Sequence, residues 1–150
     1  MATFTLEAGA AAPRETVFEV LADHRGYADI SRVRRSTLER EGDPPPNGVG
    51  AIRRLESVGP PLREEIVEYV PHERLRYTLL SGAPLKDHFG TVELESTGPQ
   101  TTRVTYRIDT TPTIRPLAPL AVRIVRKAVQ QLLDGIVRES ERRFREGRRG

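Results

Sequence analysis

The sequence predicts an α+β fold in which one antiparallel sheet curls around a single long helix at the C-terminal end. Three observations support this prediction. Apolar and polar residues alternate with a period of two through most of the chain up to residue 110, which is typical of strands with one buried face. One amphipathic pattern at helical spacing then runs over residues 117–144, roughly 42 Å of helix. The turns between the strands are short, so neighbouring strands pair as antiparallel hairpins.

The expected elements follow in order along the chain. A first strand carries Phe4, Leu6 and Ala8 and ends at Gly9. A short helix covers residues 13–21, and a second short helical or irregular piece carries Tyr27 and Ile30. Six more strands are expected over residues 34–40, 51–57, 62–70, 75–80, 87–95 and 103–110, separated by runs rich in glycine and proline. The sheet therefore has seven strands.

The long C-terminal helix has one apolar and one charged face. The apolar arc contains Leu117, Leu120, Ala121, Ile124, Val125, Ala128, Leu132 and Ile136. Charged residues interrupt this arc too early for a membrane span, and the apolar positions drift too far for a coiled coil. Gly135 lies within the buried arc, which leaves two interpretations: a close helix contact or bend, or room for a ligand.

Composition sets bounds on the function. The 150 residues show no break in composition, which predicts one domain over residues 1–150, with the tail 145–150 frayed. No cysteine is present, so disulfides, thiolate metal sites and cysteine nucleophiles are excluded. The three histidines lack metal-ligand spacing, and we expect neither a metal nor a cofactor. A net charge of +3 gives no reason to expect nucleic-acid binding, and the absence of a signal-peptide pattern at the start predicts a cytoplasmic location.

Several segments carry a family resemblance. The opening run at residues 12–23 reads APRETVFEVLAD, and GVGAIR, REEI, RLRY and TRVTY follow at residues 48–53, 63–66, 74–77 and 102–106. In this order they resemble the START-like (SRPBCC) superfamily, in particular its polyketide cyclase/dehydrase-type ligand-binding proteins. The resemblance implies the helix-grip fold, with two short helices after the first strand and an elongated apolar cavity between sheet and long helix. The chain departs from the pattern in lacking any tryptophan, since members often carry Trp and Pro where residues 28–31 read ADIS.

Strand alternation selects candidate polar groups for this cavity. Tyr77 and Tyr106 should both face the long helix, as should His88. Asp87 points the opposite way in a regular strand, so the two neighbours do not form an Asp–His dyad. Phe89, on the polar face, warns of a bulge that would shift this register.

Arg53 has two possible registers. If it alternates with Ala51 and Leu55 it points inward, where it would bind a carboxylate, phosphate or enolate. If Ile52 points inward instead, Arg53 lies in water, and the rarity of buried charge favours this second register. One carboxylate of the Glu64, Glu65 and Glu68 group could also approach the cavity.

These patterns predict a cavity of a few hundred Å³, made possible by the small residues Ala51, Gly90, Ala128 and Gly135. The expected ligand-binding residues are Tyr27, Arg53, Leu55, Ile66, Tyr77, Leu79, His88, Gly90, Tyr106, Ile108, Ile124, Ala128 and Leu132. The expected function is binding of a hydrophobic or amphipathic small molecule such as a lipid, an isoprenoid or a polyketide-like compound. Two alternatives stay open: a polyketide cyclase or aromatase that uses the cavity Arg, Tyr and His, and a protein or nucleic-acid interaction module. We expect no stable membrane insertion, and the sequence leaves the oligomeric state open.

Overall fold

The computed structural model describes residues 1–149 of the chain, and their side chains through Gly147. The strands are β1 (Ala2–Ala10), β2 (Arg35–Arg40), β3 (Ile52–Glu56), β4 (Leu62–Val70), β5 (Arg74–Ser81), β6 (Leu85–Gly98) and β7 (Thr101–Pro112). The helices are α1 (Arg14–Ala22), α2 (Tyr27–Ile30) and α3 (Ala118–Arg149), with 3₁₀ turns η1 (His24–Gly26) and η2 (Arg115–Leu117).

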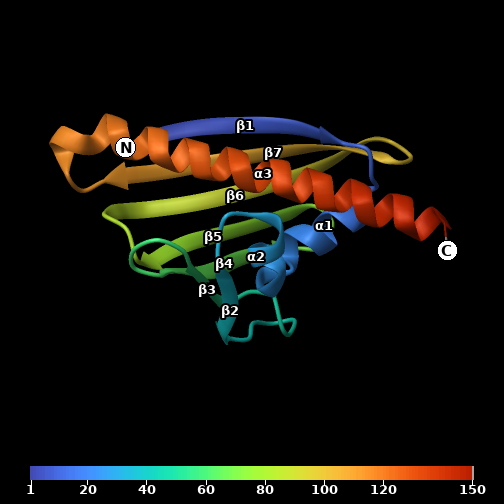
Figure 1. Cartoon of the computed structure of the whole chain (residues 1–150), viewed down its shortest axis with the longest axis horizontal. Coiled ribbons are helices and arrows are strands. Elements are labelled where there is room, and N and C mark those ends of the chain that lie inside the picture. Colours follow the sequence, from blue (N-terminus) through green and yellow to red (C-terminus); the bar gives the residue numbers. More distant parts are fainter. Residues whose placement is uncertain (150) are drawn as a thin grey trace.

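The strands form one antiparallel sheet of seven strands in the order β1-β7-β6-β5-β4-β3-β2. From β2 to β7, strands that follow one another in sequence pair with one another. The first strand, β1, pairs with β7 and forms one edge of the sheet. The long helix α3 crosses the face of this sheet, and α1 and α2 lie beside it on the same side (Figure 1). The predicted α+β fold, a seven-stranded sheet around one long helix with short helices after the first strand, is confirmed.

The helix α3 has buried residues only from Val129 onward. Val129, Leu133 and Ile136 are buried, whereas none of residues 118–128 is. Leu117, Leu120 and Ile124, expected on the buried arc, are 51%, 51% and 61% exposed. The buried strip is rotated by roughly a quarter turn from the predicted one. A helical wheel shows which residues share a face, but the contacts with other elements decide which part of a broad apolar arc is covered.

The C-terminal end of α3 extends beyond the predicted residue 144. Arg142 forms ion pairs with Glu139 and Glu146, and Arg143 pairs with Glu139, all at helical spacing. The helix continues to Arg149 and Gly150 lies outside the described residues, so fraying of the tail 145–150 stays a prediction.

Gly135 is the point of closest approach between α3 and α2. A Cβ at this position would collide with the carbonyl oxygen of Ile30, the last residue of α2. Of the two interpretations of Gly135, close contact is therefore the one the structure supports.

Replacing Gly135 with Ala should destabilise the protein by about 1–3 kcal/mol, because the backbone of α2 must move to admit the methyl group. This is a net loss, because the steric cost exceeds the gain of about 1 kcal/mol in helix propensity on replacing Gly with Ala. Gly147→Ala, in the same helix but facing open space, is the matched control and should be neutral or stabilising. Urea unfolding measures both, and equal stability of the two variants would contradict the close contact.

Candidate functional site

A cavity of about 470 Å³ lies between the sheet and the N-terminal half of α3. Its volume agrees with the predicted few hundred Å³. The lining residues are Tyr27, Ser31, Arg32, Val33, Arg53, Leu55, Ser57, Leu62, Glu64, Tyr77, Leu79, Ala83, Leu85, His88, Tyr106, Ile124, Val125, Ala128, Val129, Gln131 and Leu132. Most of this surface is apolar, and each of the strands β3, β4, β5, β6 and β7 contributes one polar side chain to it: Arg53, Glu64, Tyr77, His88 and Tyr106.

The predicted origin of this volume was wrong in part. Ala51 is fully buried in the core, the ring of Tyr77 covers Gly90, and Gly135 contacts Ile30. Only Ala128 borders the cavity. The space exists because residues 118–128 of α3 are not buried against the sheet, as the exposure of Ile124 shows.

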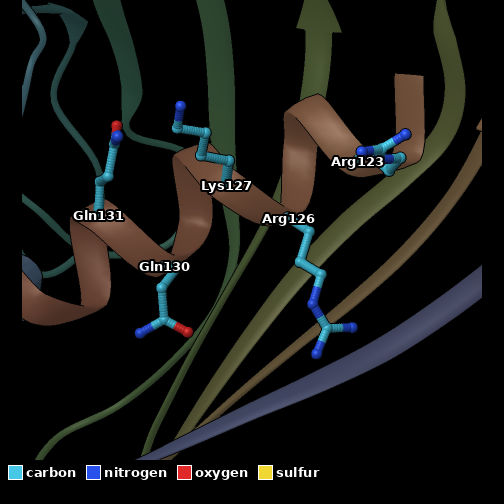
Figure 2. A pocket seen from close by; sticks show the side chains of 5 residues that line it. All are labelled: Arg123, Arg126, Lys127, Gln130 and Gln131. Atoms are coloured by element: carbon cyan, nitrogen blue, oxygen red, sulfur yellow. The ribbon is translucent and has the colours of Figure 1, made fainter. Parts of the chain in front are cut away.

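A second depression, of about 480 Å³, follows the outer side of α3. Figure 2 shows the long side chains of Arg123, Arg126, Lys127, Gln130 and Gln131 that line it, spread along the helix. None of them is buried. Because a specific site needs groups held in place, the cavity on the sheet side is the better candidate.

The charged group in the cavity wall is Arg53, and it points inward. Its side chain is 1% exposed, and its Nε donates a hydrogen bond of 2.8 Å to Oε1 of Glu64. The guanidinium carbon lies over the rings of Tyr27 and Tyr77, at 4.7 and 4.5 Å from their centroids. The exposed register favoured by sequence was wrong, because Glu64 stands directly opposite Arg53 in the β3–β4 pairing and neutralises it.

His24 accepts a hydrogen bond from the guanidinium of Arg53. Its Nδ1 lies 3.3 Å from Nη1 of Arg53, and because a guanidinium can only donate, Nδ1 is the acceptor. The proton is therefore on Nε2, which donates to the carbonyl of Asn47 at 3.1 Å. Burial, together with the charge of Arg53, lowers the pKa of His24 to about 3. His24 is thus neutral at physiological pH.

Two tyrosine hydroxyls meet in the cavity wall. The oxygens of Tyr77 and Tyr106 are 2.6 Å apart, so one donates to the other and the second proton is free for another acceptor. Burial raises the pKa of both groups, which keeps them protonated. A third buried tyrosine, Tyr27, donates its hydroxyl to the carbonyl of Leu21 at 2.6 Å.

His88 faces the cavity despite a bulge in β6. The register shifts between Lys86 and Phe89, and Asp87 takes a left-handed φ of 49°. Nδ1 of His88 lies 2.9 Å from the hydroxyl of Thr110, and among the described residues Nε2 has no hydrogen-bond partner. Burial lowers the pKa of His88, so the ring is neutral at pH 7. Asp87 is exposed, and the two neighbours form no dyad, as expected.

Most of the predicted ligand-binding residues line the cavity: Tyr27, Arg53, Leu55, Tyr77, Leu79, His88, Tyr106, Ile124, Ala128 and Leu132. Their contact with a ligand stays a prediction. Ile66, Gly90 and Ile108 do not line it. The two isoleucines are fully buried in the packed core, and the ring of Tyr77 covers Gly90.

Sequence reasoning missed several residues of the site. His24 and Thr110 hold Arg53 and His88 in place, and neither shows a pattern that marks it. Glu64 could have been identified, because pairing the β3 and β4 strands across their short turn places it opposite Arg53.

The sequence matches the family described as "Polyketide cyclase / dehydrase and lipid transport" over residues 1–141. The chain belongs to this family. No curated protein gives a significant sequence match. The family assignment supports a role in ligand binding or cyclase chemistry and leaves the substrate open.

Solved structures with the same fold include an aromatase/cyclase, Zhui, from a Streptomyces species, with a TM-score of 0.83 and 20% identity over 95% of this chain and 94% of that one. Norcoclaurine synthase from Thalictrum flavum, in complex with dopamine and hydroxybenzaldehyde, has a TM-score of 0.73 and 13% identity over 91% and 84%. A START superfamily protein from Mycobacterium smegmatis has a TM-score of 0.75 and 12% identity over 91% and 97%. At these identities the similarity shows the helix-grip fold.

Within residues 1–149, no cluster of three or more histidine or acidic side chains is arranged to hold a metal ion. Over the same residues, no helix combines the length and the apolar character that a membrane crossing requires.

The buried His24 should make stability depend on pH. Its pKa is about 3 in the folded protein against 6.5 when unfolded, so on acidification the unfolded state binds a proton that the native state excludes. Stability is unaffected above about pH 6.5 and falls between about 6.5 and 3. The variant His24→Gln keeps one hydrogen-bond acceptor and one donor in the side chain but cannot bind a proton. Between pH 7 and 5 its free energy of unfolding, measured in urea, should fall by about 2 kcal/mol less than that of the wild type. Parallel curves for the two proteins would contradict a neutral buried His24.

The Arg53–Glu64 pair should behave as one unit. Arg53→Met alone should cost about 3–5 kcal/mol because it leaves the carboxylate of Glu64 buried without a partner. The double variant Arg53→Met/Glu64→Leu should recover most of this loss. Arg63→Met, which breaks the half-exposed pair with Glu39, is the control and should cost about 1 kcal/mol or less. Additive losses in the double variant would show that the two charges are not coupled.

Proposed function

We propose that this protein binds one apolar or amphipathic small molecule, such as a lipid, an isoprenoid or a polyketide-like compound, in the cavity between its sheet and α3. The observation that carries the proposal is a cavity of about 470 Å³ with apolar walls and a few fixed polar groups on one side. This combination is typical of small-molecule sites. The family assignment supports the same function.

Two parts of the cavity offer different contacts to a ligand. Leu55, Leu79 and Leu132 offer apolar contact along its length. Tyr77 and His88 offer hydrogen bonds, because their partners hold them in fixed orientations and each retains an unused proton or lone pair. The apolar body of a ligand would supply most of the affinity, and the polar groups would fix its orientation.

Filling the cavity should abolish binding without harming the fold. Ala128 borders the cavity and is exposed, so Ala128→Trp places a large ring in the space without disturbing the core. We expect the affinity for the neutral dye Nile red to fall at least about tenfold, with stability changed by about 0.5 kcal/mol or less. Gln130→Trp, on the outer side of the same helix, is the matched control. Equal dye binding by both variants would contradict the proposed site.

A polyketide cyclase or aromatase is the second candidate. The observation in its favour is that Arg53, Tyr77, His88 and Tyr106 all line one cavity, and proton transfer needs such convergence. Against it, the orienting partner of His88 is the hydroxyl of Thr110, which stabilises a charged imidazole less than a carboxylate would. Neither Arg53 nor a tyrosine hydroxyl forms a hydrogen bond with His88 among the described residues.

The two candidates respond differently to His88→Ala. If the protein only binds, affinity should fall by about 1 kcal/mol, or about fivefold, and Tyr106→Phe should cost less. If it catalyses, ligand retention should stay nearly intact while product formation from a reactive polyketide chain falls by about 10² or more. Calorimetry and chromatographic product analysis measure the two quantities. We expect the binding outcome, and turnover that is lost in His88→Ala would contradict it.

A further inference from the structure

The polar part of the cavity is electrically neutral although two charged side chains lie in it. Arg53 and Glu64 are 1% and 6% exposed and form an ion pair of 2.8 Å. The tyrosines are protonated and the ring of His88 is uncharged, because burial shifts each pKa toward the neutral form. A ligand that enters therefore meets hydrogen-bonding groups without meeting an excess of positive charge.

The guanidinium of Arg53 already forms hydrogen bonds and cation–π contacts within the protein. Its Nε donates to Glu64, its Nη1 donates to His24, and the ring centroids of Tyr27 and Tyr77 lie 4.7 and 4.5 Å from its central carbon. An anion brought to this group would form a cluster with Glu64 that carries a net negative charge away from water. A net charge buried without a partner is unfavourable, so the ion pair opposes an anionic ligand.

The same groups suit an uncharged oxygen. Among the side chains described, those of residues 1–147, only Arg53 donates a hydrogen bond to Glu64, so the second carboxylate oxygen can accept another. Nε2 of His88 has no partner in the described chain, and one proton of the Tyr77–Tyr106 pair is unused. A hydroxyl group can donate and accept here, and a ketone can accept.

We propose that the ligand presents an uncharged oxygen, as in an apolar alcohol, phenol or ketone, to Glu64, His88 and the Tyr77–Tyr106 pair, and that the cavity rejects carboxylates and phosphates at this position. This inference rests on the proposed function and narrows its ligand class. It excludes fatty acids bound with the carboxylate inside, and it interprets the buried arginine as a structural cation with its charge already compensated.

The test compares naphthol with naphthoate, two probes that share a ring system and differ in charge. An anion bound in the opposite direction could use Arg32, the other arginine of the lining, which is exposed. The comparison is therefore made in the Arg32→Gln variant, by fluorescence titration at pH 7.5. We expect naphthol to bind at least about tenfold more tightly, the value of one hydrogen bond to a charged group. Equal or tighter binding of naphthoate would overturn the inference and leave the proposed function intact.

A second variant tests the cause of the discrimination. Glu64→Gln removes the negative charge, so the positive charge of Arg53 is no longer compensated. The ratio of naphthol affinity to naphthoate affinity should therefore fall at least about tenfold, or naphthoate should become the tighter ligand. Glu65→Gln, on the next residue of β4 and paired with Arg40 outside the cavity, should leave the ratio unchanged. An unchanged ratio in folded Glu64→Gln protein would overturn the assigned cause. If Glu64→Gln does not fold, the Arg32→Gln comparison still decides the inference. If neither probe nor Nile red binds, the proposed function itself fails.

Discussion

A buried ion pair between neighbouring strands organises the polar wall of the cavity. Arg53 on β3 and Glu64 on β4 are both withdrawn from water, which costs several kcal/mol for each ion unless close partners replace the solvent. The structure supplies such partners from elements that are distant in sequence. Tyr27 comes from α2, Tyr77 from β5 and His24 from η1. One buried charge therefore holds α2, η1 and three strands in a single arrangement.

The second constraint is the unequal packing of α3. The part from Val129 onward is held by the sheet, by α1 and by α2, where Gly135 allows close contact with the carbonyl of Ile30. Residues 118–128, at the N-terminal end of the helix, include no buried residue, and Ile124, Val125 and Ala128 among them line the cavity. The packed part fixes the helix, and the unburied part leaves the space that forms the cavity. A fully packed α3 would have stabilised the fold and removed the site.

The sequence was sufficient to predict the fold, because alternation, short turns and one long amphipathic pattern each report local structure. It predicted the cavity, and most of the residues that it selected line that cavity, but features that depend on distant contacts were missed. Arg53 appeared too costly to bury until Glu64 was placed opposite it. The exposed Leu120 and Ile124 looked like core because a helical wheel contains no neighbours. Similarly, Gly90 looked like empty space, although the ring of Tyr77 lies over it.

The central claim is that the cavity is a ligand site whose polar wall is neutral, and native mass spectrometry of the freshly purified protein tests it most directly. The account predicts a population heavier than the bare chain by the mass of one small molecule. Organic extraction should release that molecule as an apolar compound with an uncharged oxygen, and Ala128→Trp protein should lack it. A bare chain that gains no mass when incubated with apolar alcohols, phenols or ketones would contradict the claim, as would a bound molecule whose carboxylate contacts Arg53.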